Sequence, residues 1–180
     1  MRLPAPPRQW PRGPGRGQIR DLSRQGQDGA EDGENGQVVA EGIALGATGM
    51  FAGLALQVSL AEQPARLALL ARARLQHWQA SAGRAQTLAL PFALAGCAGG
   101  LAAWAQSGGP LWLAGALLVG ATVPVSLLMI APTARRLRAL DPREAGPTSN
   151  ALIARWGRRH AARTALAVGA EALLALATFA

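Results

Sequence analysis

The sequence predicts an all-α fold: an integral membrane four-helix bundle with a disordered N-terminal tail. Three observations predict it. Half of the 180 residues are hydrophobic, yet only 4% are aromatic, so the apolar content is Ala, Leu, Gly and Val, the residues of closely packed membrane helices. The apolar residues gather in four runs of about 20, the length needed to cross a bilayer. All the basic residues are arginines, and most lie before or between these runs.

The N-terminal segment, residues 1–37, is rich in Arg, Gly, Pro, Gln and Asp and has few apolar side chains. Such a segment cannot offset its ordering entropy by burial, so we expect a disordered tail. Its stretch PRGPGRG is similar to arginine–glycine segments that bind RNA, but a solvated tail is the simpler interpretation, and no nucleic-acid partner is predicted. A translation start near Val38 is an alternative that the sequence leaves open. Residues 38–180 are predicted to form one transmembrane domain.

The four predicted spans differ in their small residues and connections. They cover residues 38–60, 87–106, 111–131 and 161–180. Glycines four apart place small residues on one helix face, where a second helix or a second copy of the chain can approach closely. These pairs are Gly42 and Gly46, Gly49 and Gly53, and Gly96 and Gly100. Residues 107–109 predict a tight turn, and residues 61–86 predict a short amphipathic helix at the membrane surface.

The distribution of arginines predicts the topology. The connections after the first and third spans are both basic, whereas the connection after the second span has no charge. Cytoplasmic loops of membrane proteins carry an excess of Arg and Lys. We therefore expect a multi-pass protein of the cell membrane with both basic loops in the cytoplasm and both termini outside.

One helical face near the last span carries the most informative constellation. At about 100° per residue, Trp156, His160, Arg163 and Glu171 fall within roughly one third of the helix circumference. Ionisable groups within a membrane span usually face the bundle interior. A permanent cation disfavours a protonated histidine beside it, which suits a base or a hydrogen-bond donor to an anionic ligand. The alternatives are an interface belt in which Arg163 snorkels to lipid headgroups, and a protonated packing role for Glu171.

A second polar group follows the first span. Glu62 and Arg66 are four residues apart and can pair, and His77 follows in the basic connection. If the two basic loops fold over the mouth of the bundle, these three side chains and those of His160 and Arg163 converge on one substrate-binding pocket. Two histidines and scattered carboxylates lack metal-ligand spacing, and one cysteine cannot form an intrachain disulfide. No metal or cofactor is predicted.

Four segments carry a resemblance to a known family: residues 49–69, 77–86, 131–142 and 151–166. The last segment has Trp156, His160 and Arg163 in a W-x-x-x-H-x-x-R arrangement. Residues 38–180 resemble the anthrone-oxygenase-like family of four-helix membrane proteins. The resemblance implies oxidation of an anthrone to an anthraquinone without metal or flavin. His160 would then be the base, Arg163 would stabilise the enolate oxygen, and Trp156 would stack on the substrate.

The chain also departs from the family pattern. The family commonly has an aromatic residue where this chain has Ala82 and Asn where it has Ala134, and Glu171 matches nothing in the pattern. Two functions therefore stay open. The first is cofactor-independent oxidation of a small aromatic or quinone-like substrate. The second is a non-catalytic membrane protein that binds a lipid, a quinone or a partner helix through its glycine faces.

Overall fold

The computed structural model describes the backbone of residues 16–180 and the side chains of residues 33–82 and 87–180. The chain divides between Gly36 and Gln37 into two units, and the second, Gln37–Ala180, contains the bundle. Helix α1 (Arg16–Gln57) begins inside the segment predicted to be a disordered tail. Extending an existing helix costs far less than nucleating one, so the first span can propagate into weakly helical sequence. Residues 1–15 lie outside the described residues, and their disorder stays a prediction.

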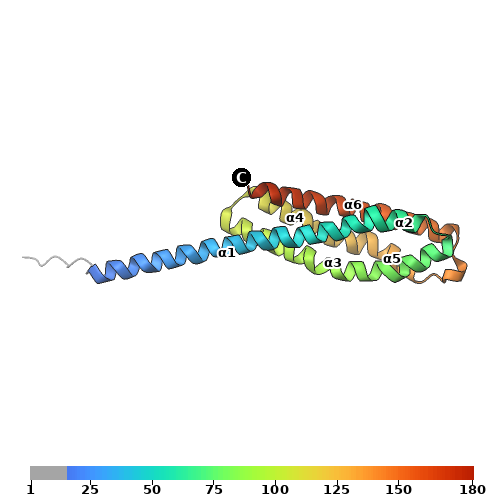
Figure 1. Cartoon of the computed structure of the whole chain (residues 1–180), viewed down its shortest axis with the longest axis horizontal. Helices are drawn as coiled ribbons and strands as arrows, with labels where there is room; N and C mark the ends of the chain where they lie inside the picture. The colour runs from blue at the N-terminus through green and yellow to red at the C-terminus, as the bar shows by residue number, and fades with distance from the viewer. Residues whose placement is uncertain (1–15) are drawn as a thin grey trace, which may run out of the picture. The chain divides into compact units, whose positions relative to one another are not determined.

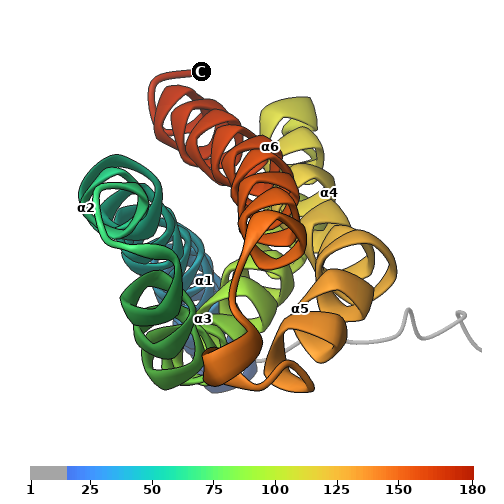
Figure 2. The ribbon, with the colours of Figure 1, turned by 90° about the vertical axis from the view of Figure 1, so that its right-hand side faces the viewer.

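Four helical rods make up the bundle, and no strand occurs among residues 16–180. Figure 2 shows the rods of the second unit end-on, around a common interior. Their elements are, in order, α1 with a π-helical turn η1 (Val58–Glu62) and α2 (Gln63–Leu67); α3 (Ala71–Ser107); α4 (Pro110–Val125) with a π-helical turn η2 (Ser126–Ile130) and α5 (Ala131–Arg138); and α6 (Pro147–Ala177). A short 3₁₀ turn, η3 (Pro142–Glu144), lies between α5 and α6.

Three helical stretches in the described residues are long and apolar enough to cross a membrane: Gly33–Leu67, Thr87–Ser107 and Pro110–Arg138. They contain the predicted spans at 38–60, 87–106 and 111–131, and the all-helical membrane bundle is confirmed. The predicted fourth span, 161–180, is not among them, because the C-terminal half of α6 combines charged side chains with a helix end at Ala177. Its passage through the bilayer stays a prediction.

The two ends of the bundle have different connections (Figure 1). At one end, Gly108 takes a left-handed φ of 72°, a conformation that suits glycine, and Pro110 then starts α4. The predicted turn at 107–109 is confirmed. At the other end lie both basic connections, which touch each other: Arg74 Nη1 donates to Asn150 Oδ1 at 3.0 Å. Arg74 Nη2 also donates to the carbonyls of Leu67 and Leu69, and so closes the turn into α3.

The prediction of a surface helix within residues 61–86 was wrong. Helix α3 starts at Ala71 and runs without a break through the second apolar span to Ser107. Leu75 and Trp78 are fully buried, in a cluster with Leu137 and Trp156. The side chains of Leu75 and Trp78 therefore pack against the third and fourth rods, whereas Leu67 and Leu70, before α3, are exposed. The side chains of Leu75 and Trp78 are thus buried by protein and not by lipid, and the segment extends the bundle beyond the second apolar span.

Small residues let the helices approach closely in the centre of the bundle. A Cβ atom added to Gly96 would collide with Thr48, and one added to Gly100 would lie 3.0 Å from the Ala116 Cβ. The predicted packing role of this pair is therefore confirmed within the chain. The four glycines of the first predicted span behave differently, because Gly42, Gly46 and Gly53 face open space and Gly49 meets the side chain of Glu171. A homo-oligomer formed through these open glycines stays a prediction.

Candidate functional site

Two π-helical turns face the same stretch of α6. Turn η1 supplies Ser59, which contacts His160, and turn η2 supplies Ser126, which contacts Arg163. Each turn ends two residues before a proline, Pro64 or Pro132. A proline ring clashes with the carbonyl four residues earlier and removes one N–H donor, and a widened turn accommodates both effects. The prolines therefore fix where two inner helices bulge toward α6.

A chain of hydrogen bonds fixes the ring of His160, which is only 4% exposed. Arg163 Nη2 lies 2.8 Å from His160 Nε2, and Ser59 Oγ lies 3.2 Å from His160 Nδ1. Ser59 Oγ lies 2.8 Å from Thr164 Oγ1, which donates to the His160 carbonyl at 3.0 Å. Every polar atom of the imidazole and of both hydroxyls thus has a partner within the bundle.

The Arg163 guanidinium fixes the tautomer of His160. A guanidinium has donors and no acceptor, so His160 Nε2 must accept from Arg163. The ring proton then lies on Nδ1, within hydrogen-bond distance of the Ser59 and Thr164 hydroxyls. Thr164 Oγ1 also reaches the carbonyls of Ala55 and His160, at 3.3 and 3.0 Å. His160 is accordingly a neutral imidazole whose basic lone pair, on Nε2, points at a cation.

Arg163 is a buried cation, 5% exposed, with few partners. Besides His160, its guanidinium contacts the Ser126 hydroxyl at 3.4 Å and lies 5.5 Å from the centre of the Phe51 ring. Its Nε has no hydrogen-bond partner. Among the described side chains, no carboxylate lies within ion-pair distance of it. A buried charge without a counter-ion is costly, so this position favours an anionic ligand.

Arg66 is a second buried cation, and each of its three side-chain nitrogens has a hydrogen-bond acceptor. It donates to Gln63 Oε1 at 2.6 Å, to Ser81 Oγ at 3.0 Å and to His77 Nδ1 at 3.4 Å. Its ion pair with Glu62 spans 3.1 Å. The guanidinium also lies 5.5 Å from the centre of the Trp156 ring, within cation–π distance. Arg66 thereby joins α2 to α3 and α6.

A small cavity of about 10 Å³ separates the two arginines. Its lining residues are Val58, Glu62, Arg66, Ala82, Trp156, His160 and Arg163. This volume admits about one oxygen-sized atom. Trp156 packs edge-on against Trp78, with ring centres 5.6 Å apart, and neither indole N–H has an acceptor. The polar part of the cavity wall therefore consists of two guanidinium groups, an indole, the imidazole and one carboxylate.

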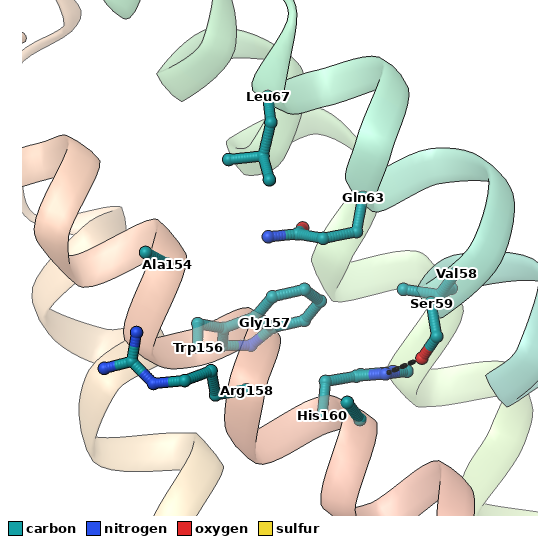
Figure 3. A pocket seen from close by; sticks show the side chains of 10 residues that line it. Val58, Ser59, Gln63, Leu67, Ala154, Trp156, Gly157, Arg158 and His160 are labelled. Carbon is teal, nitrogen blue, oxygen red and sulfur yellow. Dashed lines mark hydrogen bonds between the residues drawn. The ribbon is translucent and has the colours of Figure 1, made fainter.

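Two larger cavities adjoin this small one. The first, of 320 Å³, lies between η1 and α6 and shares Val58, Trp156 and His160 with the small cavity. Figure 3 shows Gln63 and Leu67 on one side of it, and Ala154, Arg158 and the Ser59–His160 hydrogen bond around the rest. The second, of 460 Å³, is lined by Gln57, Glu62, His77, Ser81 and neighbouring apolar side chains. Both volumes fall in the range of small-molecule sites, about 300–1,000 Å³.

The structure brings together most of the side chains that the sequence singled out. Glu62, Arg66, Trp156, His160 and Arg163 line one cavity. Trp156, His160 and Arg163 are all at most 5% exposed, so they face the bundle interior and the interface-belt alternative does not describe this fold. His77 is exposed and reaches the site through its contact with Arg66.

Glu171 lies apart from this group. It is half-buried, packs beside Gly49 and lines none of these three cavities. Eight residues of α6 separate it from Arg163, which is slightly over two helical turns. A direct contact with a ligand held at His160 is therefore outside its reach in this arrangement.

Several polar partners escaped the sequence analysis. Ser59, Gln63, Ser81, Ser126 and Thr164 hold the two arginines and the histidine. Single serines and threonines in apolar helices carry no spacing signal, and Ser59 lies 101 residues from His160 and Ser126 lies 37 residues from Arg163 in the sequence. The prolines at 64 and 132 were the available clue, because they mark the bulged turns.

The family comparison agrees with this geometry. The model of the anthrone oxygenase family matches residues 78–173, slightly more than half of the chain. The chain belongs to the anthrone oxygenase family. No curated protein and no solved structure matches it. The matched region contains Trp156, His160 and Arg163 but starts after Arg66, so the Arg66 cluster is a feature that this structure adds. Among the described residues, no group of three or more His, Cys, Asp or Glu side chains could hold a metal ion.

Proposed function

We propose that this protein oxidises a small aromatic ketone of the anthrone type with dioxygen, using no cofactor. Family membership and one structural observation support the proposal. The observation is a buried cation without a counter-ion, Arg163, hydrogen-bonded to the lone pair of a neutral histidine beside a ring-sized cavity. An enolate supplies the missing negative charge, and a tricyclic ring system suits the 320 Å³ cavity against Trp156.

Because Arg163 is hydrogen-bonded to His160, the imidazole can act as a base only after substrate has bound. Nε2 cannot accept a second proton while the guanidinium donates to it. A substrate oxygen that enters the small cavity offers Arg163 a better acceptor, because charge-assisted hydrogen bonds to an anionic oxygen are stronger than those to a neutral nitrogen. Arg163 then turns toward that oxygen and frees Nε2, which takes a proton from the CH₂ group opposite the carbonyl in the central ring of the substrate. Ser59 holds the ring in place through Nδ1.

The overall reaction balances with dioxygen as the oxidant. The CH₂ carbon loses a proton to His160, and the resulting enolate is oxidised by O₂ to a hydroperoxide, with the proton returned from His160. Loss of the second C–H proton and cleavage of the O–O bond give the new carbonyl and one water. One oxygen atom of O₂ ends in the quinone and the other in water, so no external reductant is needed.

The test is anthrone oxidation by the purified protein, followed as quinone absorbance and O₂ uptake above a protein-free blank. His160→Ala should lower kcat/KM by about 10²–10⁴-fold, the range for a general base. Arg155→Ala is the matched control, because this exposed arginine lies on the same helix. Equal rates for wild type and His160→Ala, with both folded, would instead support the non-catalytic alternative, in which the cavity holds a lipid or a quinone.

The membrane orientation belongs to the same proposal. Both basic connections lie at the site end of the bundle, and the positive-inside rule places that end in the cytoplasm of a cell-membrane protein, with α6 as a fourth span. In a Cys97→Ala background, Arg72→Cys should react with a membrane-impermeant maleimide only after cell lysis, and Ser107→Cys should react in intact cells. The reverse pattern would overturn this orientation.

A further inference from the structure

A fourth cavity also touches Arg163, but different helices form it. Its lining residues are Phe51, Leu90, Ala93, Thr122, Val123, Ser126, Leu127 and Arg163. It lies where η2 bulges, between α3 and α4, whereas the small cavity at His160 lies between η1 and α6. Arg163 is the one lining residue that the two cavities share.

The size of this cavity excludes the ring-shaped substrate. Its volume is about 50 Å³, compared with 320 Å³ for the cavity beside Trp156. An apolar cavity of about 150 Å³ is known to hold benzene or xenon, and about 10–15 Å³ is needed for one water-sized sphere. A volume of 50 Å³ therefore suits a molecule of two or three heavy atoms.

The chemistry of the lining disfavours water. Thr122 Oγ1 donates to the Val119 carbonyl at 2.6 Å, and Ser126 Oγ donates to the Thr122 carbonyl at 2.7 Å. Both hydroxyl protons are thus used inside their own helix. A buried water needs two to four polar partners, and beyond Arg163 and the two hydroxyl oxygens, which can still accept, the other five lining residues are hydrocarbon. A small apolar molecule fits this lining better.

The rim of the cavity lies on the outer surface of the bundle. Leu90 and Leu127 are 46% and 62% exposed, and they belong to two of the stretches apolar enough to cross a membrane. Dioxygen is apolar and dissolves more readily in hydrocarbon than in water. With these stretches in the bilayer, the two exposed leucines place the rim of the cavity against the acyl chains.

From these observations we infer that the cavity at Phe51, Ala93 and Leu127 takes dioxygen from the lipid and holds it beside Arg163. This inference rests on the proposed function. The enolate and dioxygen then occupy two different cavities, and the Arg163 guanidinium lines both of them. When one electron passes from the enolate to O₂, the substrate becomes a neutral radical and O₂ becomes superoxide. The negative charge moves from one cavity to the other, and Arg163 lies beside it before and after the step.

The first test does not require catalysis. Dissolved O₂ is paramagnetic and speeds the relaxation of nearby methyl groups. With ¹³C-methyl alanine labelling in detergent under O₂ pressure, Ala93 should relax faster than Ala89, which lies one turn away on α3 and is equally buried at 2% exposure. Equal relaxation of the two methyl groups would overturn the inference, even where anthrone oxidation is observed.

The second test uses the rim. Leu127→Trp should narrow the entrance and raise KM for O₂ severalfold, while KM for anthrone and kcat at saturating O₂ stay unchanged. Leu128→Trp is the matched control, because Leu128 is 76% exposed and does not line the cavity. Equal KM values for O₂ in the two variants would contradict the inference. Fast relaxation at Ala93 without any oxidation would defeat the proposed function and leave the dioxygen cavity standing.

Discussion

Arg66 and Arg163 are both buried arginines at the same end of one bundle, yet their surroundings differ. Arg66 has four side-chain acceptors, one of them the carboxylate of Glu62. Arg163 has a neutral imidazole, one distant hydroxyl and an Nε without a partner. The difference teaches that burial alone does not identify a functional cation. A guanidinium whose nitrogens all have protein acceptors joins helices, whereas one with an unpaired N–H and no counter-ion can bind a ligand.

The largest expected effect is the loss of the satisfied cation. Arg66→Met removes one partner of a buried ion pair and leaves the acceptors of Gln63 and Ser81 unpaired, which costs about 3–5 kcal/mol of unfolding free energy. Because Glu62 is 28% exposed and can turn to solvent, we expect the lower end of that range. Denaturant titration in detergent would measure it. A wild-type midpoint for Arg66→Met would show that the cluster does not hold α2 to α3.

Replacing the unsatisfied cation should act on the reaction instead. Arg163→Met should lower kcat by about 10²–10³-fold, the range for removing one donor to a developing oxyanion. Its unfolding free energy should be unchanged or higher, because removal of a buried charge without a counter-ion relieves a desolvation cost. The same titration, run beside Arg66→Met, measures this. Destabilisation equal to that of Arg66→Met would remove the distinction between the two arginines.

A smaller effect is expected one contact away from the imidazole. Ser59→Ala removes the acceptor for the His160 Nδ1 proton, a net loss of about 0.5–1.5 kcal/mol, or roughly two- to twelvefold in kcat. Ser59→Thr keeps the hydroxyl and should restore most of the rate, which a purely structural role would not require. Steady-state kinetics of the two variants tests this positioning role. A rate for Ser59→Thr as low as that of Ser59→Ala would count against it.

The smallest effect concerns the carboxylate of the Arg66 cluster. Glu62→Gln keeps a hydrogen-bond acceptor for Arg66 and removes only the charge, and a partly exposed ion pair contributes about 1 kcal/mol or less. The variant should unfold within that margin of wild type at low salt, and the difference should shrink in high salt. A large loss of activity with normal stability would instead place Glu62 among the groups that contact substrate.

Features that depend on neighbouring residues could be predicted from the sequence, whereas contacts between distant residues could not. Span length and hydrophobicity are local, so three spans emerged close to their observed bounds. The face with Trp156, His160 and Arg163 followed from helical periodicity alone. Partners on other helices were not visible in the sequence, which is why Ser59, Ser126 and the two bulged turns were missed. The segment from Ala71 to Trp78 was misjudged because its apolar side is buried by α5 and α6, and no local pattern distinguishes burial by protein from burial by lipid.

The hydrogen-bond chain around His160 closes on itself. It joins Arg163 to the imidazole, the imidazole to Ser59 and Thr164, and Thr164 to the His160 carbonyl. Glu171, the next acid along α6, is not joined to this chain, and its Oε2 has no partner. Among the described side chains, no hydrogen bond therefore passes a proton from the imidazole to Glu171. In the proposed oxidation the proton that His160 takes up returns to the substrate, so the reaction moves no net charge across the bilayer.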